Sequence, residues 1–356
     1  MGVMDTTSRW LETNTFHHAQ FADVADLLRR KQGEDLTLSL CIPTLNEART
    51  IAAVVAPLRA ELQERVPLLD EIAVIDSGSI DRTRELAAAA GAEVYLAADI
   101  LQAMGRYCGK GENLWKAVYQ LKGDILVFLD GDVTNVHPGF VTGLVGPLLH
   151  RPEIGYVKSF YDRPTRPEGI ESAFGGGRVT EILIRPLFSL YFPELTTIIQ
   201  PLAGEYAVRR EILKQLAFPV GYGVETAHLI DLYATHGLGV FAQTDLSLRR
   251  HRSRTNRELG KAAFAVLQVM GRRLRERGIL LAAPQGSGGL RQFHRQGQHH
   301  YQEVHEIVEH ERPPMSSVAA YQQKWGGVSP GEGPTAENTI CGNGYMTARA
   351  GFERCG

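Results

Sequence analysis

Apolar segments of strand length alternate with helical patterns along the first third of this 356-residue chain, and this alternation constrains the possible folds more than any other feature of the sequence. The strand-like segments lie at 36–42, 71–75, 92–96 and 125–129. Helical patterns separate them at 50–62, after Asp81, and after 109–112. The order strand, helix, strand is typical of βαβ units, whose strands are apolar throughout because helices cover both faces of the sheet. The sequence therefore predicts an α/β protein with a mostly parallel sheet.

The remaining chain is less regular. Strands are predicted at 156–161, near 203–208 and at 240–248, and helices at 171–190, 224–236 and 258–277. The first strand is expected to stop at Pro43, because proline has no N–H to donate to a sheet. The segment after 284 is rich in Gly, Gln, His and Pro and its end shows no periodicity, which predicts a helical and then irregular C-terminal extension with a mobile tail.

Composition excludes several broad classes of protein. With 44% hydrophobic and 22% charged residues, the chain can bury a large core. Its formal net charge of −2 argues against a general nucleic-acid binder, although a cluster of arginines between 249 and 257 leaves room for a small anionic ligand. No stretch comes close to the roughly 18 consecutive apolar residues of a membrane-spanning helix. The lack of such a stretch also predicts that the chain has no membrane partner. The four cysteines are scattered, as in a protein with reduced thiols, so we expect a cytoplasmic location.

Polar clusters follow three of the predicted strands. They are Pro43-Thr44-Leu45-Asn46-Glu47, Asp76-Ser77-Gly78-Ser79 and Asp130-Gly131-Asp132. Open α/β sheets bind ligands at the carboxyl ends of their strands, so these clusters are expected to meet at one edge. Two carboxylates there can hold Mg²⁺ or Mn²⁺, which can in turn neutralise a diphosphate. Each cluster alone is also ordinary turn or helix-cap chemistry, and it is their joint occurrence that indicates a nucleotide site.

The three clusters resemble the nucleotide-sugar half of GT-A glycosyltransferases. Further motifs narrow the resemblance to the glucosyl-3-phosphoglycerate and mannosyl-3-phosphoglycerate synthases. Those motifs lie at 109–112, 157–161, 175–181, 200–206 and 221–225. The resemblance, which spans about 36–257, implies a Rossmann-like GT-A fold. It also implies a retaining transfer of a hexose from a nucleoside diphosphate sugar to the 2-hydroxyl of 3-phosphoglycerate, for synthesis of a compatible solute or a polysaccharide precursor.

Individual residue roles follow from the resemblance. The implied donor site comprises Pro43, Leu45, Asn46, Glu47, Ser77, Lys110, Asp130, Gly131 and Tyr222. The implied acceptor site comprises Gly177, Arg178, Val179, Thr180 and Arg249, where backbone N–H groups, guanidinium forks and a hydroxyl suit a phosphate and a carboxylate. Asp132 and His251 are expected to hold the divalent ion, Mg²⁺ or alternatively Mn²⁺ or Co²⁺. Ser253 stands where the family pattern has asparagine, so an acceptor role is not carried over to position 253.

The predicted catalytic residues are Asp132, Lys110 and Glu225. The metal and Lys110 would stabilise charge on the departing nucleoside diphosphate. Glu225 is either a nucleophile or a residue that caps a helix or binds sugar hydroxyls. We favour front-face attack by the acceptor hydroxyl, with the leaving phosphate as proton acceptor. The expected donor is GDP-mannose, with GDP-glucose and UDP-glucose as competitors, because no motif distinguishes the bases or the sugars.

The implied organisation has four parts and a homodimer as the assembly. The parts are an N-terminal helical segment (1–34), a catalytic domain (35–257) divided into nucleotide-sugar (35–135) and acceptor (136–257) halves, a helical extension that can act as a dimer arm (258–325), and a tail (326–356). Two other functions remain open, a polyprenyl-phosphate hexosyltransferase of the same fold and a non-catalytic nucleotide-sugar-binding protein.

Overall fold

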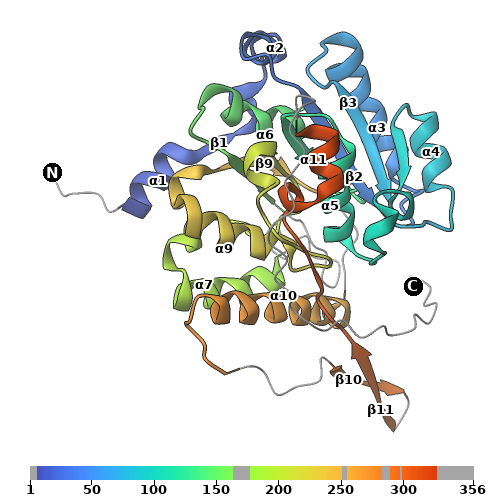
Figure 1. Cartoon of the computed structure of the whole chain (residues 1–356), viewed down its shortest axis with the longest axis vertical. Coiled ribbons are helices and arrows are strands. Elements are labelled where there is room, and N and C mark those ends of the chain that lie inside the picture. Colours follow the sequence, from blue (N-terminus) through green and yellow to red (C-terminus); the bar gives the residue numbers. More distant parts are fainter. Residues whose placement is uncertain (1–5, 163–176, 251–254, 283–288, 297–298, 327–356) are drawn as a thin grey trace, which may run out of the picture.

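An eight-stranded sheet with helices on both faces forms the centre of the molecule (Figure 1). The computed structural model describes residues 6–162, 177–250, 255–282, 289–296 and 299–326. The strand order is β1-β9-β6-β7-β5-β2-β3-β4. Strand β7 runs antiparallel to both of its neighbours, and the other pairings in this sheet are parallel. The predicted α/β fold with a mostly parallel sheet is confirmed.

Most strands of this sheet coincide with predicted segments. They are β1 (Thr15–His17), β2 (Leu38–Thr44), β3 (Glu71–Asp76), β4 (Glu93–Leu96), β5 (Ile125–Phe128), β6 (Tyr156–Asp162), β7 (Tyr206–Arg209) and β9 (Phe241–Leu248). Strand β1 was not predicted, because three residues carry too little periodicity to read. It pairs in parallel with β9 and so attaches the N-terminal segment to the sheet.

The prediction that the first strand stops at Pro43 is wrong. Strand β2 runs on to Thr44, and Pro43 stands in register with Ile75 of β3. On its other side β2 pairs with β5 only as far as Cys41. Alternate residues of a parallel strand bond to opposite neighbours. The missing N–H of Pro43 therefore faces the side on which β5 has already ended, and no ladder bond is lost there.

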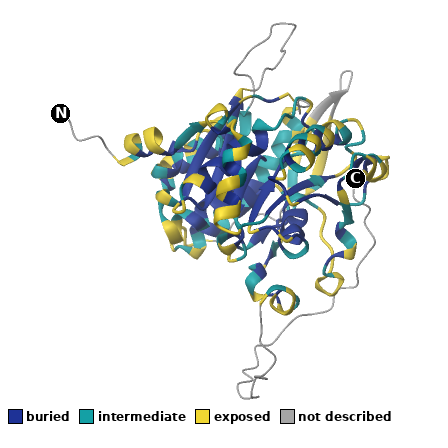
Figure 2. Cartoon of the chain, turned by 90° about the horizontal axis from the view of Figure 1, so that it is seen from above, coloured by how far each residue is buried: buried dark blue, intermediate teal, exposed yellow. Residues whose placement is uncertain are grey.

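The helices divide between the two faces of the sheet. They are α1 (Thr6–Asn14), α2 (Val24–Gly33), α3 (Ile51–Arg59), α4 (Thr83–Ala89), α5 (Lys110–Gln120), α6 (Gly139–His150), α7 (Arg185–Tyr191), α8 (Arg210–Leu213), α9 (Val224–His236), α10 (Asn256–Glu276) and α11 (Ala319–Trp325). One core contains Leu126 and Phe128 with α5, α9 and α10, and the other contains Ile125 and Val127 with α3 and α6. Figure 2 shows the buried sheet between these two layers. Both faces of β5 are covered, which explains its uninterrupted apolar sequence.

Helix α6 was not predicted. Every residue from Phe140 to Leu149 is buried. A helix that is buried all round has no polar face and gives no amphipathic pattern. Within the described parts of the chain, no helix is long and apolar enough to cross a membrane.

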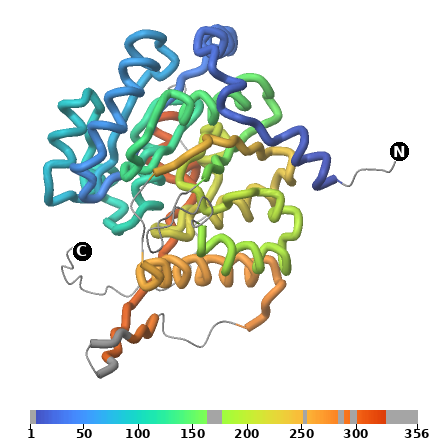
Figure 3. Tube along the Cα trace, turned by 180° about the vertical axis from the view of Figure 1, so that it is seen from behind, coloured from blue at the N-terminus to red at the C-terminus, as the bar shows by residue number. Residues whose placement is uncertain are grey.

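The C-terminal region differs from the predicted helical extension. After α10, strands β10 (Gly289–Gln296) and β11 (His299–Glu306) form an antiparallel hairpin that extends from the body of the molecule (Figures 1 and 3). Strand β12 (Glu311–Arg312) then returns to pair with β8 (Phe218–Pro219). The predicted tail lies outside the described residues, as does the first part of the helix predicted at 171–190, which is described from a π-helix (Thr180–Ile184) into α7.

The cysteines only partly match the expectation of reduced thiols. Cys41 is a buried free thiol, whose pKa is raised by burial. Cys108 is disulfide-bonded, so the expectation is wrong at that position.

Candidate functional site

Asp130 and Asp132 follow β5 at the carboxyl edge of the sheet. Gly131 between them packs against the loop after β2, where an added side chain would lie 3.2 Å from Thr44 Cγ2 and 3.4 Å from Glu47 Cγ. A larger residue would crowd this contact. The glycine therefore brings the acidic turn against the first polar cluster, and the structure places these two strand ends together.

The loop after β3 is organised by Asp76. This carboxylate is fully buried and accepts hydrogen bonds from Gly78 N at 2.9 Å, Ser79 N at 2.7 Å and Thr44 Oγ1 at 2.8 Å. Asn46 has a φ of 59°, in the left-handed region, and its side chain accepts a bond from this same loop. Asp76 and Asn46 thus fix the shape of the two loops relative to each other.

Other predicted donor residues differ in their exposure. Leu45 is 38% exposed and Tyr222 is 45% exposed, so both side chains are accessible to a ligand. Ser77 Oγ donates to Asn113 Oδ1 on α5 at 3.0 Å. This bond ties the loop after β3 to the helix that begins with Lys110.

The two glycines that flank Lys110 allow close approach of another backbone segment. Gly109 has a φ of 148°, and a side chain there would collide with the carbonyl oxygen of Val220. A side chain at Gly111 would collide with the carbonyl oxygen of Pro219. The motif therefore seats the start of α5 directly against the segment that leads into α9.

Lys110 joins two carboxylates from different elements. Its Nζ lies 2.6 Å from Asp130 Oδ1 and 3.0 Å from Glu225 Oε1, and the side chain is only 17% exposed. Burial alone would lower the pKa of Lys110, but the charges of Asp130 and Glu225 and their hydrogen bonds raise it above its usual value. The ammonium group therefore stays charged at neutral pH.

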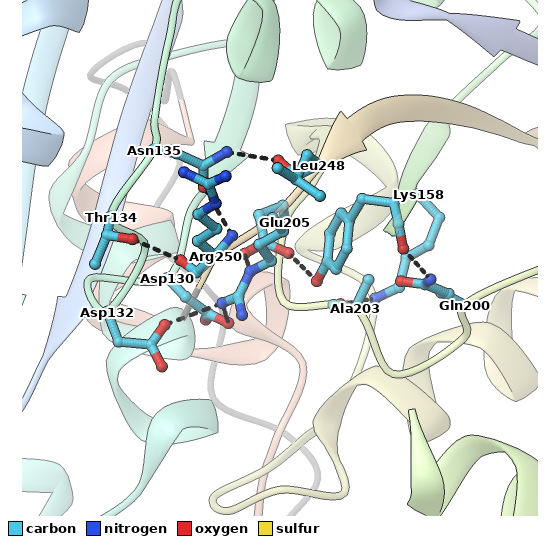
Figure 4. Close-up of polar contacts among 12 residues, drawn as sticks. Asp130, Asp132, Thr134, Asn135, Lys158, Gln200, Ala203, Glu205, Leu248 and Arg250 are labelled. Carbon is cyan, nitrogen blue, oxygen red and sulfur yellow. Dashed lines mark hydrogen bonds and ion pairs between the residues drawn. The ribbon is translucent and has the colours of Figure 1, made fainter. Parts of the chain in front are cut away.

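Arg249, after β9, connects both strand-end acids to a buried glutamate. Its Nη2 lies 3.0 Å from Asp130 Oδ2 and 3.0 Å from Asp132 Oδ1, and its Nε donates to Glu205 Oε1 at 2.6 Å. Glu205 is fully buried and also accepts a bond from Tyr161 Oη at 2.7 Å. Figure 4 shows Glu205 beside the two acids. Arg249 is 3% exposed, and its pKa is raised because these negative charges outweigh the effect of burial.

Sequence reasoning missed Glu205 and Lys158 as functional residues, although both lie in motifs that it quoted. Lys158 Nζ donates to the carbonyl oxygen of Ala203 (Figure 4). It also lies 4.9 Å from the ring centre of Tyr206. Burial lowers the pKa of Lys158 to about 8, against an opposing attraction from Glu225. Neither residue has a spacing that marks it. Their only signal is a charged residue inside an otherwise apolar strand or motif, which calls for a buried partner.

The predicted acceptor residues are only partly described. Gly177 has a φ of 82°, where glycine is favoured, and Arg178 donates to Asn256 at the start of α10. Thr180, which begins the π-helix, is 5% exposed. The preceding glycines lie outside the described residues, and so does His251. The structure therefore brings Arg249, but not a complete acceptor set, to the strand-end acids.

Asp130 and Asp132 supply oxygen donors of the kind that a hard divalent cation binds, although within the described residues no group of three or more Asp, Glu, His or Cys side chains forms a complete metal site. Both carboxylates converge on one guanidinium nitrogen, and their side chains are 27% and 25% exposed. Carboxylate oxygens at an accessible sheet edge are the ligands that Mg²⁺ and Mn²⁺ prefer. Glu205 and Glu225 bring the local carboxylates to four, against the positive charges of Lys110, Arg249 and Lys158, so the local charge remains negative and favours a cation.

Comparison with known proteins gives consistent matches. The sequence model of glycosyl transferase family 2 matches residues 39–216. The glucosyl-3-phosphoglycerate synthase of Petrotoga mobilis is 49% identical over 311 residues, which cover 87% of this chain and 96% of that protein.

Solved structures are similar over the same extent. The mannosyl-3-phosphoglycerate synthase of Rubrobacter xylanophilus has a TM-score of 0.78 and 35% identity, and the match covers 87% of this chain and 97% of that one. The glucosyl-3-phosphoglycerate synthase of Mycobacterium tuberculosis, in complex with Mn²⁺, UDP and phosphoglyceric acid, has a TM-score of 0.75 and 38% identity, covering 86% and 99%. That enzyme has also been solved with Mn²⁺ and UDP-glucose, and with Mg²⁺ and UDP.

Proposed function

From the premise that this chain belongs to glycosyl transferase family 2 and, within it, to the glucosyl- and mannosyl-3-phosphoglycerate synthases, we propose that it transfers glucose from UDP-glucose to the 2-hydroxyl of 3-phosphoglycerate with retention at the anomeric carbon. The chain is a glycosyltransferase of the GT-A fold and a hexosyl-3-phosphoglycerate synthase. The identity of the sugar donor, UDP-glucose, is what the proposal adds to this activity.

The choice of donor replaces the earlier expectation of GDP-mannose, which the comparisons do not support. The relative with 49% identity is named a glucosyl enzyme, and the Mycobacterium tuberculosis relative binds UDP-glucose. The exposed Leu45 and Tyr222, together with Ser77, which bonds to Asn113 of α5, give the edge of the sheet an accessible surface suited to a nucleoside. The sequence alone offered no feature that separates uracil from guanine.

A single observation carries the proposed mechanism, namely the seating of Lys110 between Asp130 and Glu225. The raised pKa keeps this ammonium group charged, and its position beside the strand-end acids suits it to stabilise the departing diphosphate. Asp132, with His251, would hold a divalent ion with Asp130 beside it, and that ion would supply further positive charge at the diphosphate. The ion-paired Asp130 and Glu225 orient Lys110.

Glu225 is a poor candidate for a nucleophile in this arrangement. It is 5% exposed, and its Oε1 is engaged by Lys110. A carboxylate that is buried and neutralised by a cation attacks weakly. We therefore retain front-face attack by the acceptor hydroxyl, with the leaving phosphate accepting the proton. Gly177, Arg178, Val179, Thr180 and Arg249 remain the proposed acceptor residues.

The two alternative functions are not carried further. The relatives and structures that cover 86–87% of the chain are named as hexosyl-3-phosphoglycerate synthases, rather than as lipid-phosphate transferases or binding proteins. A homodimer and a cytoplasmic location remain parts of the proposal. The β10–β11 hairpin supports the former by exposing Phe293, Tyr301 and Val304, and sedimentation of the purified chain at micromolar concentration tests it.

The deciding experiment is a donor panel. The purified protein is incubated with 3-phosphoglycerate, Mg²⁺ and, separately, UDP-glucose, GDP-glucose, GDP-mannose or ADP-glucose, and nucleoside diphosphate release is followed with the phosphorylated product. Acceptor-dependent release that is greatest with UDP-glucose is the expected result. Turnover that is greatest with GDP-mannose would overturn the donor assignment, and no turnover with any of the four would overturn the function.

A further inference from the structure

A C-terminal segment far in sequence from the site packs against the elements that carry it. We call residues 307–325 the C-terminal strap. It is held by Gln268 of α10, which donates to the carbonyl oxygen of Ile307 at 2.6 Å, and by the pairing of β12 with β8. Arg312 binds the buried Glu112 of α5 through two contacts of 2.7 Å. The strap therefore bridges α10, β8 and α5.

Glu309 is the residue of the strap that faces the site. Its side chain is 5% exposed, and its Oε2 accepts a hydrogen bond from Gly221 N at 3.0 Å, while the amide of Tyr222 also bonds to the carboxylate. A side chain added at Gly221 would collide with this carboxylate. Two consecutive backbone amides thus converge on one buried acid, and Gly221 provides the space for it.

Burial at this position disfavours the charged form of the Glu309 carboxylate. Burial raises its pKa, and the nearby charge of Glu225 acts in the same direction, although the two amides and Arg272 oppose the shift. An uncharged side chain would avoid the cost of removing this charge from water. The direct effect of the bonds that Glu309 makes is to fix the backbone at 221–222.

The backbone segment 219–223 connects three proposed site residues. The preceding carbonyl oxygens of Pro219 and Val220 pack against the glycines on either side of Lys110. Three residues after Gly221, helix α9 begins and carries Glu225, whose carboxylate lies 3.0 Å from Lys110 Nζ. Tyr222 itself is 45% exposed. A shift of this loop would move Tyr222 and alter the seating of Lys110 together.

We propose that Glu309 is a positioning residue for catalysis, which anchors the 219–223 loop so that Tyr222 and the Lys110–Glu225 pair keep their places in the donor site. The inference rests on the proposed function only in assigning Tyr222 and Lys110 to the donor. The anchoring itself follows from the contacts of Glu309.

The test compares Glu309→Gln and Glu309→Ala with Glu311→Gln as the matched control. Glu311 lies two residues further along the same strap, but its carboxylate binds Arg273 of α10 at 2.7 Å. The measurements are kcat and KM for UDP-glucose, the thermal midpoint, and amide hydrogen exchange of a peptide covering 219–223. We expect Glu309→Gln to raise the donor KM by at least about fivefold, since it weakens two charge-assisted hydrogen bonds, and Glu309→Ala to raise it further.

Two results together support the proposal. Amide exchange at 219–223 is faster in both Glu309 variants, and the donor KM of Glu311→Gln stays within about twofold of wild type. An unchanged donor KM in Glu309→Gln overturns it, as does an equal rise in Glu311→Gln, which would mean that any loosening of the strap has the same effect. If the wild-type protein does not turn over these substrates, the proposed function fails. Hydrogen exchange then decides the anchoring separately, and unchanged exchange at 219–223 would overturn it.

Discussion

Lys110 Nζ lies 2.6 Å from Asp130 Oδ1, and this ion pair joins the start of a helix to the end of the central strand that precedes the acidic turn. The partners come from two sequence motifs that show no relation to each other when the chain is read linearly. Their contact makes Lys110 part of the same site as the carboxylates. The first prediction concerns this lysine.

Replacement of Lys110 by Ala is expected to lower kcat by about 10²-fold or more, because a preorganised positive charge at the leaving group is lost. The acceptor KM should change little. Steady-state kinetics with 3-phosphoglycerate and UDP-glucose measure both constants. Lys214→Ala is the control and should leave kcat unchanged, since among the described residues the Lys214 side chain pairs only with the exposed Glu211. A Lys110→Ala enzyme with wild-type kcat would remove Lys110 from the mechanism.

The glycines beside Lys110 give a prediction about backbone approach. In Gly111→Ala the added methyl group would meet the carbonyl oxygen of Pro219, so the 219–223 loop must move and the free energy of unfolding should fall by about 1–3 kcal/mol. Urea denaturation measures this change, and kcat should fall with it. Gly33→Ala is the matched control, because a methyl group there meets nothing within 4 Å. Equal stability of Gly111→Ala and Gly33→Ala would contradict the packing argument.

The buried pair of Glu205 and Arg249 should contribute strongly to folding. Glu205→Gln leaves the buried Arg249 without its closest charge partner, and we expect a loss of about 3 kcal/mol in the free energy of unfolding. Tyr161→Phe removes only the hydroxyl that donates to Glu205 and should cost about 1 kcal/mol. Urea denaturation of the two variants in parallel measures this ranking, and a reversed order would refute it.

Burial of Lys158 makes the free energy of unfolding depend on pH. The pKa of Lys158 is lowered by burial to about 8 in the folded protein, from an ordinary value of 10.5. Between these values the unfolded chain binds more protons, so this group makes stability rise with pH above about 8. Below pH 8 the full cost of keeping the buried lysine charged is present, which is on the order of 3 kcal/mol.

The measurement is urea denaturation at pH 7.5, 8.5 and 9.5 for the wild type and for Lys158→Met. The free energy of unfolding of the wild type should rise relative to that of the variant across this range. The comparison cancels the titration of other groups common to both proteins. A constant difference between the two proteins would mean that Lys158 does not titrate in this window.

The elements that the sequence predicted are those with a local pattern. The central strand before Asp130 and helix α9 could be placed because apolar runs and helical spacing are visible in a single segment. Helix α6 could not, since all residues from Phe140 to Leu149 are buried and the helix has no polar face. Strand β1 depends on a long-range pairing with β9 that no local pattern announces.

The site residues also divide into those that a local sequence pattern marks and those that it does not. Asp130, Asp132 and Lys110 stand out because strand ends and glycine-flanked turns mark them. Glu205 and Glu309 act through partners that are 44 and 88 residues away in sequence, so a linear reading gives no reason to select them. Charged residues within otherwise apolar motifs are the one signal that could have drawn attention to Glu205.

Removal of divalent metal gives the last prediction. Treatment with a chelator should abolish turnover, and Mg²⁺ or Mn²⁺ should restore it, because the charge on the departing diphosphate needs more compensation than Lys110 provides. Asp132 and His251 are the proposed ligands, so Asp132→Asn and His251→Ala should each raise the metal concentration for half-maximal activity by at least about tenfold. His236→Ala, at an exposed position in α9, is the control.

Direct binding separates a lost ligand from a lost catalyst. Titration of Mn²⁺ into the protein with UDP, followed by electron paramagnetic resonance of the free ion, reports affinity without turnover. Weaker binding in both Asp132→Asn and His251→Ala is expected, because each removes one ligand. In the wild-type structure Arg249 Nη2 lies 3.0 Å from Asp132 Oδ1, and Asp132→Asn also leaves Arg249 with Asp130 and Glu205 as its carboxylate partners among the described residues. Wild-type Mn²⁺ affinity in His251→Ala would remove that residue from the metal site and leave the strand-end acids as its protein ligands.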